Sequence, residues 1–291
     1  MKKTSSICAA ILTLLFLWEA VQPRRADSAD LLKTMVSVAP QRYFVEKIGG
    51  DRVHVEAMVP EGASPATFDP SPGKIRQLSD AALYFAVGVP FEKTWLEKFA
   101  RANPLMRTIM THDGIERFPM ASHHAHHGAP PDPHVWLSPP LVAIQARNIM
   151  LALCKADPVH RRAYQANYGR FMAELVNLDL KIQDFFPGNT EKIHFMVYHP
   201  SWGYFARAYG LEQVPVEMAG KTPTGKTLTR QMQTAKRLKV KIIFAQPQFS
   251  TKSAQLIADA IGGKVVIADP LAPDWAANLL DVAHRFRMAL R

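Results

Sequence analysis

Short apolar runs alternate along most of the chain with longer segments in which apolar residues recur at helical spacing. In the first half, the short runs predict strands at 32–38, 53–59, 82–87 and 106–110. The segments between them predict helices at 41–48, 71–79 and 91–102, the first of them closed by Gly49 and Gly50. Regular alternation of strand and helix predicts a parallel sheet covered by helices.

The second half repeats this alternation. Its apolar runs predict strands at 193–198, 213–218, 241–245 and 264–268. Helical spacing predicts helices at 200–209, 228–238, 250–261 and 275–290. We therefore expect a second parallel sheet with its own covering helices.

A long helical segment separates the two halves. A first helix follows Pro139 and runs to about Ala156, and Asp157 with Pro158 then predicts a capped helix start. From there to Phe186 the apolar residues keep helical spacing, which at 1.5 Å per residue gives a rod of roughly 40 Å. We expect an α/β protein of two lobes, each with a central parallel sheet flanked by helices, joined by one long backbone helix. The expected divisions are an N-terminal lobe at 30–157, a linking helix at 158–187 and a C-terminal lobe at 188–291.

Residues 1–29 differ from the rest of the chain. Lys2 and Lys3 precede an apolar run from Ile7 to Trp18, and small residues follow near Ala29. This pattern predicts a signal peptide and a periplasmic location. The run is shorter than the roughly 20 apolar residues that a membrane helix needs, so we expect a soluble exported protein. Cys154 is the only cysteine after the signal, which excludes an intramolecular disulfide.

The composition, 48% hydrophobic and 21% charged, is that of a folded protein, with a formal net charge of +10. Lys and Arg occur in many segments without interleaved aromatic residues, so we interpret them as a solvated basic surface and expect no nucleic-acid partner. We also expect a monomer.

Histidines supply the strongest chemical signal. Four of them lie within five positions, His123, His124, His126 and His127, in a segment at 118–131 that is rich in proline. A histidine-rich tract is typical of metal binding, and we expect an accessory metal-capture loop here. The segment Asp132-Pro133-His134-Val135-Trp136-Leu137 follows directly, and we expect His134 to be a ligand of a buried metal site.

Two further candidate ligands come directly after predicted strands. His199 follows the strand at 193–198, and Asp269 follows the strand at 264–268. Each alone fits an ordinary turn or helix start, but in open α/β sheets ligands bind beyond the carboxyl ends of strands. With His134 they form a set of two imidazoles and one carboxylate, which suits zinc and several other transition metals.

Several segments together carry a resemblance to a known family. They are Gly49-Gly50-Asp51, Phe68-Asp69-Pro70-Ser71-Pro72, 132–139, Tyr198-His199-Pro200, Gln246-Pro247-Gln248-Phe249-Ser250 and Asp269-Pro270-Leu271. On these segments the chain resembles the metal-binding, cluster A-I solute-binding proteins of bacterial ABC transporters, the zinc and manganese group.

The resemblance implies two lobes about a rigid helix, with a metal held in the interlobe cleft by four side chains. It places the second, third and fourth ligands on His134, His199 and Asp269. Family members with a histidine at the third position look like zinc binders, so the resemblance implies Zn²⁺ as the bound ion, with Mn²⁺ as the alternative. The implied function is capture of the ion and its delivery to a membrane permease, with no catalysis.

The sequence departs from the family pattern at two positions. Ala66 stands where the family has its first histidine ligand, and Gln246 stands where it often has glutamate. Alanine cannot bind a metal, so three protein ligands and an open position remain. We expect water or a loop histidine at that position, and weaker zinc binding or a different bound species.

Two other functions compete with this interpretation. Residues Gly220-Lys221-Thr222-Pro223-Thr224-Gly225-Lys226-Thr227 match the phosphate-loop pattern, but only about 65 residues follow them, too few for a nucleotide-hydrolysing core. Three ligands with an open position also occur in hydrolytic zinc sites, yet no His-Glu-x-x-His helix is present. We therefore expect a binding protein rather than an enzyme.

Overall fold

The computed structural model describes residues 31–120, 130–187, 193–217, 223 and 225–289. The signal peptide expected at 1–29 lies outside these residues, as do the loop histidines His123, His124, His126 and His127 and half of the phosphate-loop match. Within the described part, no helix is both long enough and apolar enough to cross a membrane.

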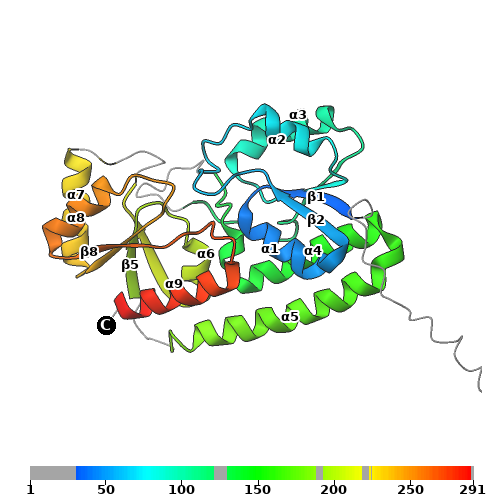
Figure 1. Ribbon diagram of the computed structural model, residues 1–291. Helices are drawn as coiled ribbons and strands as arrows, with labels where there is room; N and C mark the ends of the chain where they lie inside the picture. Colours follow the sequence, from blue (N-terminus) through cyan, green and yellow to red (C-terminus); the bar gives the residue numbers. More distant parts are fainter. Residues whose placement is uncertain (1–30, 121–129, 188–192, 218–222, 224, 290–291) are drawn as a thin grey trace, which may run out of the picture.

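The first half of the chain folds around a sheet of four parallel strands in the order β2-β1-β3-β4. The strands are β1 (Leu32–Val36), β2 (Val53–Ala57), β3 (Leu83–Ala86) and β4 (Arg107–Met110). Helices α2 (Pro72–Leu78) and α3 (Pro90–Ala102) cover one face, and α1 (Ala39–Gly49) and α4 (Pro139–Ala156) cover the other (Figure 1). Because helices cover both faces, all four residues of β3 are buried and apolar.

The second half builds a sheet with the same arrangement. Strands β5 (Ile193–Val197), β6 (Leu211–Pro215), β7 (Ile242–Ala245) and β8 (Lys264–Ile267) are parallel in the order β6-β5-β7-β8. Its helices are α6 (Gly203–Ala208), α7 (Lys226–Arg237), α8 (Lys252–Ile261) and α9 (Trp275–Ala289). The expected fold class is confirmed. In each sheet the strand order reverses beside the first strand, β1 or β5, which is the position at which such sheets bind ligands.

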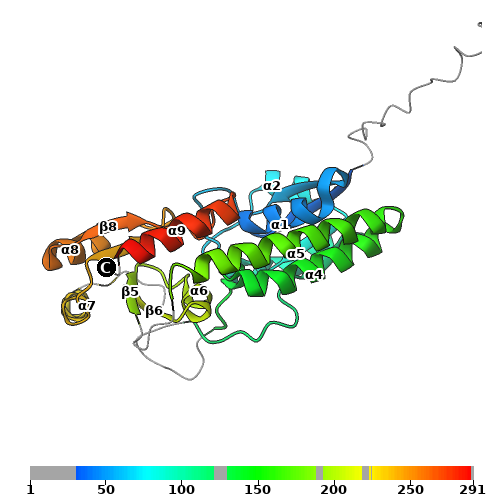
Figure 2. The same ribbon diagram turned by 90° about the horizontal axis from the view of Figure 1, so that it is seen from below.

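The long helix is α5 (Arg161–Gln183), of 23 residues, and it runs beneath both sheets (Figures 1 and 2). It begins later than the sequence predicts, because Pro158–His160 forms a 3₁₀ turn, η4. Asp157 does not cap the backbone with its side chain. Its carboxylate instead accepts hydrogen bonds from the Tyr164 hydroxyl and the His160 Nδ1, each at 2.6 Å.

Two strand and helix boundaries also differ from the prediction. Helix α6 begins at Gly203 rather than at 200, because residues 199–201 form a tight turn. Gly210 follows it with φ +69°, a left-handed conformation that reverses the chain, so β6 starts at once at Leu211 rather than at 213.

Helix α9 packs against both halves of the molecule. Near its start, the Trp275 ring meets the Phe44 ring of α1 edge-on, with centroids 4.9 Å apart. Near its end, the Phe286 ring lies 4.4 Å from the rings of Phe195 and Phe244 in the second sheet. Helices α5 and α9 therefore hold the two sheets in one packed unit.

Candidate metal site

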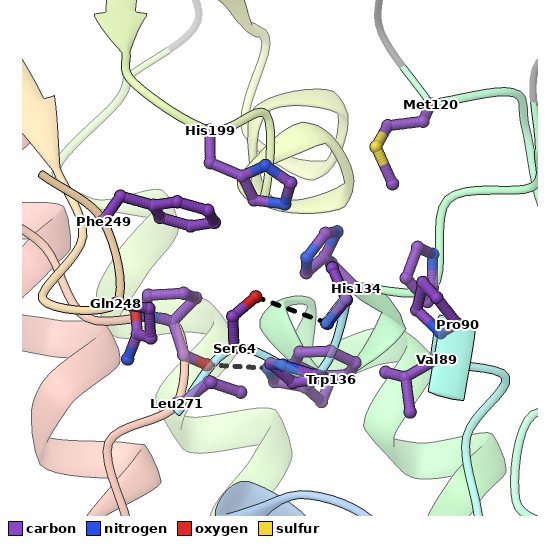
Figure 3. A pocket seen from close by; sticks show the side chains of 14 residues that line it. Ser64, Val89, Pro90, Met120, His134, Trp136, His199, Gln248, Phe249 and Leu271 are labelled. Carbon is purple, nitrogen blue, oxygen red and sulfur yellow. Dashed lines mark hydrogen bonds between the residues drawn. The ribbon is translucent and has the colours of Figure 1, made fainter. Parts of the chain in front are cut away.

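A cavity of about 50 Å³ lies between the two lobes, beyond the carboxyl ends of their strands. Figure 3 shows its walls, which are mainly apolar, with the two imidazole rings of His134 and His199 exposed to it. The N-terminal lobe contributes Ser64, Pro65, Ala66, Val89, Pro90, Met120, Pro133, His134 and Trp136, and the C-terminal lobe contributes His199, Gln248, Phe249, Pro270 and Leu271.

His134 is held in place by the turn that precedes it. It stands just before a 3₁₀ turn, η3 (Val135–Leu137), and only 8% of it is exposed. The Asp132 carboxylate is fully buried, and its Oδ1 accepts hydrogen bonds from the His134 backbone N at 2.9 Å and from Nδ1 at 2.7 Å. The spacing of the two residues around Pro133 therefore fixes both the backbone and the ring.

A hydrogen bond from the other lobe also holds the backbone of this turn. The Tyr204 hydroxyl donates to the Asp132 backbone oxygen at 3.0 Å, and burial raises the pKa of that phenol, with the Asp132 charge raising it further. Tyr204 therefore stays a donor at neutral pH. Asp132 Oδ2 has no hydrogen-bond partner among the described residues.

His199 is held by an equivalent contact in the other lobe. It follows β5, and its Nδ1 donates to Oε1 of Glu217 at 2.7 Å. Glu217 follows the neighbouring strand β6 and is 4% exposed. The Phe249 ring stacks on the imidazole, with centroids 4.9 Å apart and planes 28° apart.

The two imidazoles therefore share one arrangement. A carboxylate can only accept a hydrogen bond, so in each ring Nδ1 carries the hydrogen and Nε2 is left for another ligand. Metal-binding histidines commonly have a carboxylate partner on the other nitrogen. The ring centroids of His134 and His199 are 5.3 Å apart, so the structure brings these two candidate ligands together.

Asp269 is close to the pocket but is not among the residues that line it. It follows β8, and its Oδ1 accepts hydrogen bonds from Gln248 Nε2 at 2.8 Å and from the Leu271 backbone N at 2.9 Å. Within the described part of the chain, no three His, Cys, Asp or Glu side chains form a group that could hold a metal. Ligation by Asp269 therefore remains a prediction.

The indoles of two tryptophans donate hydrogen bonds to backbone oxygens beside the pocket. The Trp136 indole donates to the Pro270 oxygen at 2.7 Å, and the Trp275 indole donates to the Trp136 oxygen at 2.6 Å. All three residues are buried. These bonds connect the turn that carries His134 directly to the loop that carries Asp269.

The two departures from the family pattern have different consequences. Ala66 lines the pocket, where its methyl group offers no ligand atom. Gln246 is fully buried, and its amide donates to the His199 oxygen at 2.8 Å and to Ser201 Oγ at 3.1 Å while accepting from the His199 backbone N. A carboxylate could not donate these bonds, so glutamine suits the turn that carries His199.

The base of the histidine-rich segment is closed beside the pocket. Met120 N donates to the Pro130 oxygen at 3.0 Å, and Asp132 N donates to the Phe118 oxygen at 2.9 Å. Pro119 and Pro131 pair between them as an antiparallel bridge. Met120 itself lines the pocket, so the segment at 121–129 is attached at the edge of the candidate site.

Sequence reasoning did not identify the role of Glu217 or Asp132. Glu217 follows β6, the neighbour of β5, but the sequence predicts that strand to run to 218, so the strand-end signal that identified His199 missed Glu217. Asp132 lies two residues before His134, a spacing at which a carboxylate reaches the backbone and ring of a following residue.

Comparisons with known proteins show the family of the chain and agree with its fold. The ZnuA family model, described as the periplasmic component A of the zinc-uptake complex, matches residues 35–283. The high-affinity zinc uptake system protein ZnuA of Bacillus subtilis is 29% identical over 264 residues, 84% of this chain and 81% of that protein.

Solved structures are similar as well. A crystal structure of ZnuA is 41% identical, with a TM-score of 0.86 over 90% of this chain and 100% of that chain. A ZnuA deletion mutant with zinc bound is also 41% identical, with a TM-score of 0.83 over 90% of this chain and 98% of that chain.

Proposed function

The chain belongs to the family of periplasmic zinc-uptake components, and on that premise we propose that it captures zinc between its lobes and delivers it to the permease of an ABC transporter. The observation that carries the proposal is the pair of imidazoles at the cavity, each with Nδ1 bonded to a buried carboxylate. This arrangement orients each Nε2 for a metal in advance.

In the proposed site, His134 and His199 bind the ion through Nε2 and Asp269 binds it through carboxylate oxygen. Oδ1 of Asp269 is occupied by Gln248 and Leu271, so Oδ2 is the atom available to the metal. Two nitrogens and one oxygen favour zinc over manganese, which prefers oxygen ligands. Mn²⁺ is the alternative cargo.

The histidines at 123, 124, 126 and 127 have an accessory role in this proposal. They lie outside the described residues, but the segment that contains them begins and ends at the pocket edge. We propose that they raise the local concentration of zinc.

The proposal also keeps the expected division of the chain into two lobes and a linking helix, with boundaries at 157/158 and 187/188. In it, the linking helix limits the motion of the lobes.

The family members are transport proteins, and the chain is accordingly a metal-binding transport protein and not an enzyme. The hydrolase and nucleotide-binding alternatives are therefore rejected. Export to the periplasm through residues 1–29 and a monomeric state complete the proposal.

Calorimetry with zinc and with manganese tests the proposal on the wild type and on Ala66→His. The added imidazole would supply the open fourth position, so we expect tighter zinc binding. Ala100→His, an exposed site on α3, is the matched control and should leave affinity unchanged. Absence of zinc binding in both the wild type and Ala66→His would refute the proposed function.

A further inference from the structure

The positive charge of the chain is concentrated in one segment of the C-terminal lobe. Residues 218–258 contain eight Lys or Arg and no Asp or Glu. The bordering acids are Glu217, which is buried against His199, and Asp259 on α8. The basic surface is therefore less evenly spread than the sequence analysis assumed.

Helix α7 presents this charge on one side. Its buried positions are Gln231 and Ala235. Its exposed positions are Lys226, Thr229, Arg230, Gln233, Lys236 and Arg237. Four of these six side chains are cationic, and none of the six is acidic or apolar.

The charge continues beyond the helix. Lys239 and Lys241 are exposed, and the Lys241 oxygen accepts a bond from the backbone N of Lys264, a further exposed cation. We call Lys226, Arg230, Lys236, Arg237, Lys239 and Lys241 the cationic face. Within the described part of the chain, none of these six forms an ion pair, whereas Arg42 and Lys47 in the N-terminal lobe do.

The cationic face lies away from the metal pocket. Both views of the molecule place α7 at the end of the C-terminal lobe that is farthest from the N-terminal sheet (Figures 1 and 2). A partner bound there would leave the space between the lobes open. A contact at this face would therefore be separate from metal capture.

We propose that the cationic face binds the anionic phospholipid surface of a membrane. Protein interfaces favour aromatic residues and Arg and disfavour Lys, but this face is mostly Lys and its exposed positions on α7 include no aromatic residue. Unpaired Lys and Arg side chains are attracted to anionic lipid headgroups without a specific docking geometry. Attachment would keep the protein near a membrane-embedded permease, and only this last benefit rests on the proposed function.

Sedimentation with lipid vesicles tests this inference on the metal-free and zinc-loaded protein. One vesicle contains phosphatidylglycerol, and the other contains only phosphatidylcholine. We expect binding to the first alone, with loss of binding at high salt. Each cation near such a surface contributes roughly a fivefold factor. The variant Lys226→Gln/Arg230→Gln/Lys236→Gln/Arg237→Gln should therefore weaken binding by up to about 600-fold, and by at least about tenfold where only some of the four side chains reach the surface.

The matched control removes the same charge from the N-terminal lobe. It changes four exposed cations, in the variant Arg76→Gln/Lys93→Gln/Arg147→Gln/Lys155→Gln. Binding within twofold of wild type by this control supports the inference. An equal loss in both variants would assign the attraction to net charge and overturn it.

Two further outcomes would also overturn it. One is absence of wild-type binding to phosphatidylglycerol vesicles. The other is binding only to neutral vesicles that contain the permease, which would identify a protein partner. Zinc calorimetry on the α7 variant separates this question from the proposed function, because the variant should bind zinc like wild type.

Discussion

Replacing Glu217 tests whether the carboxylate behind His199 prepares that ring for the metal. Glu217→Gln keeps the size of the side chain but removes its charge, and Glu217→Ala removes the contact altogether. The 2.7 Å bond to Nδ1 holds the ring and its tautomer, and Glu217 is 4% exposed, so little water can replace it.

The expected loss follows from this geometry. Carboxylates behind metal-bound histidines contribute about 10–100-fold in affinity, or roughly 1.4–2.8 kcal/mol. Glu217→Gln can still accept a bond through its amide oxygen, so we expect a loss near tenfold. Glu217→Ala frees the ring, and we expect a loss near a hundredfold.

Competition with a chromogenic chelator at fixed pH measures these affinities. Asp157→Asn is the matched control, because Asp157 makes an equally short bond to the Nδ1 of His160 outside the pocket. Zinc affinity within twofold of wild type in both Glu217 variants would refute the reasoning. An equal loss in Asp157→Asn would do the same.

Two further predictions concern stability. Burial lowers the pKa of His112 below its ordinary 6.5, and the Arg117 charge is the second cause. The unfolded chain therefore binds this proton at a higher pH than the folded chain does. As a result, the free energy of unfolding falls as the pH drops through about 6.5. His112→Gln should therefore reduce the decline in unfolding free energy between pH 7.5 and 5.5, as measured by urea unfolding of metal-free protein; an identical decline would contradict this. Phe286→Ala should cost about 3–5 kcal/mol, because the ring is fully buried against Phe195 and Phe244. Met288→Ala, at a half-exposed position on the same helix, should change stability by less than about 0.5 kcal/mol, and equal losses would show that the packing argument is wrong.

The fold was predictable from sequence because its signals are local. Every expected strand and helix is present, since the apolar periods of strand and helix differ. The errors lie at element boundaries, where a backbone turn at 199–201, the left-handed Gly210 or a side-chain contact moves the start of a helix or strand. Asp157 contacts His160 and Tyr164 instead of capping the helix, and a sequence pattern cannot distinguish these alternatives.

The candidate site was predictable only in part. The strand-end rule found His199, and the Asp-Pro-His turn indicated His134, so both residues at the pocket came from short-range patterns. The Glu217 contact depends on two neighbouring strands placing their ends side by side, which is known only after the sheet order is known. The bond from Gln248 to Asp269 likewise joins residues 21 positions apart.

The closed base beside the pocket has a consequence for how this protein can change over evolution. A backbone hydrogen bond joins Met120 to Pro130, so the chain enters and leaves this segment at neighbouring points. Doubling the number of residues between two joined points of a chain costs only about 0.6 kcal/mol in loop-closure entropy. Insertions and deletions between 121 and 129 should therefore be nearly neutral for folding, so the number of histidines there can change with little effect on the stability of the two lobes.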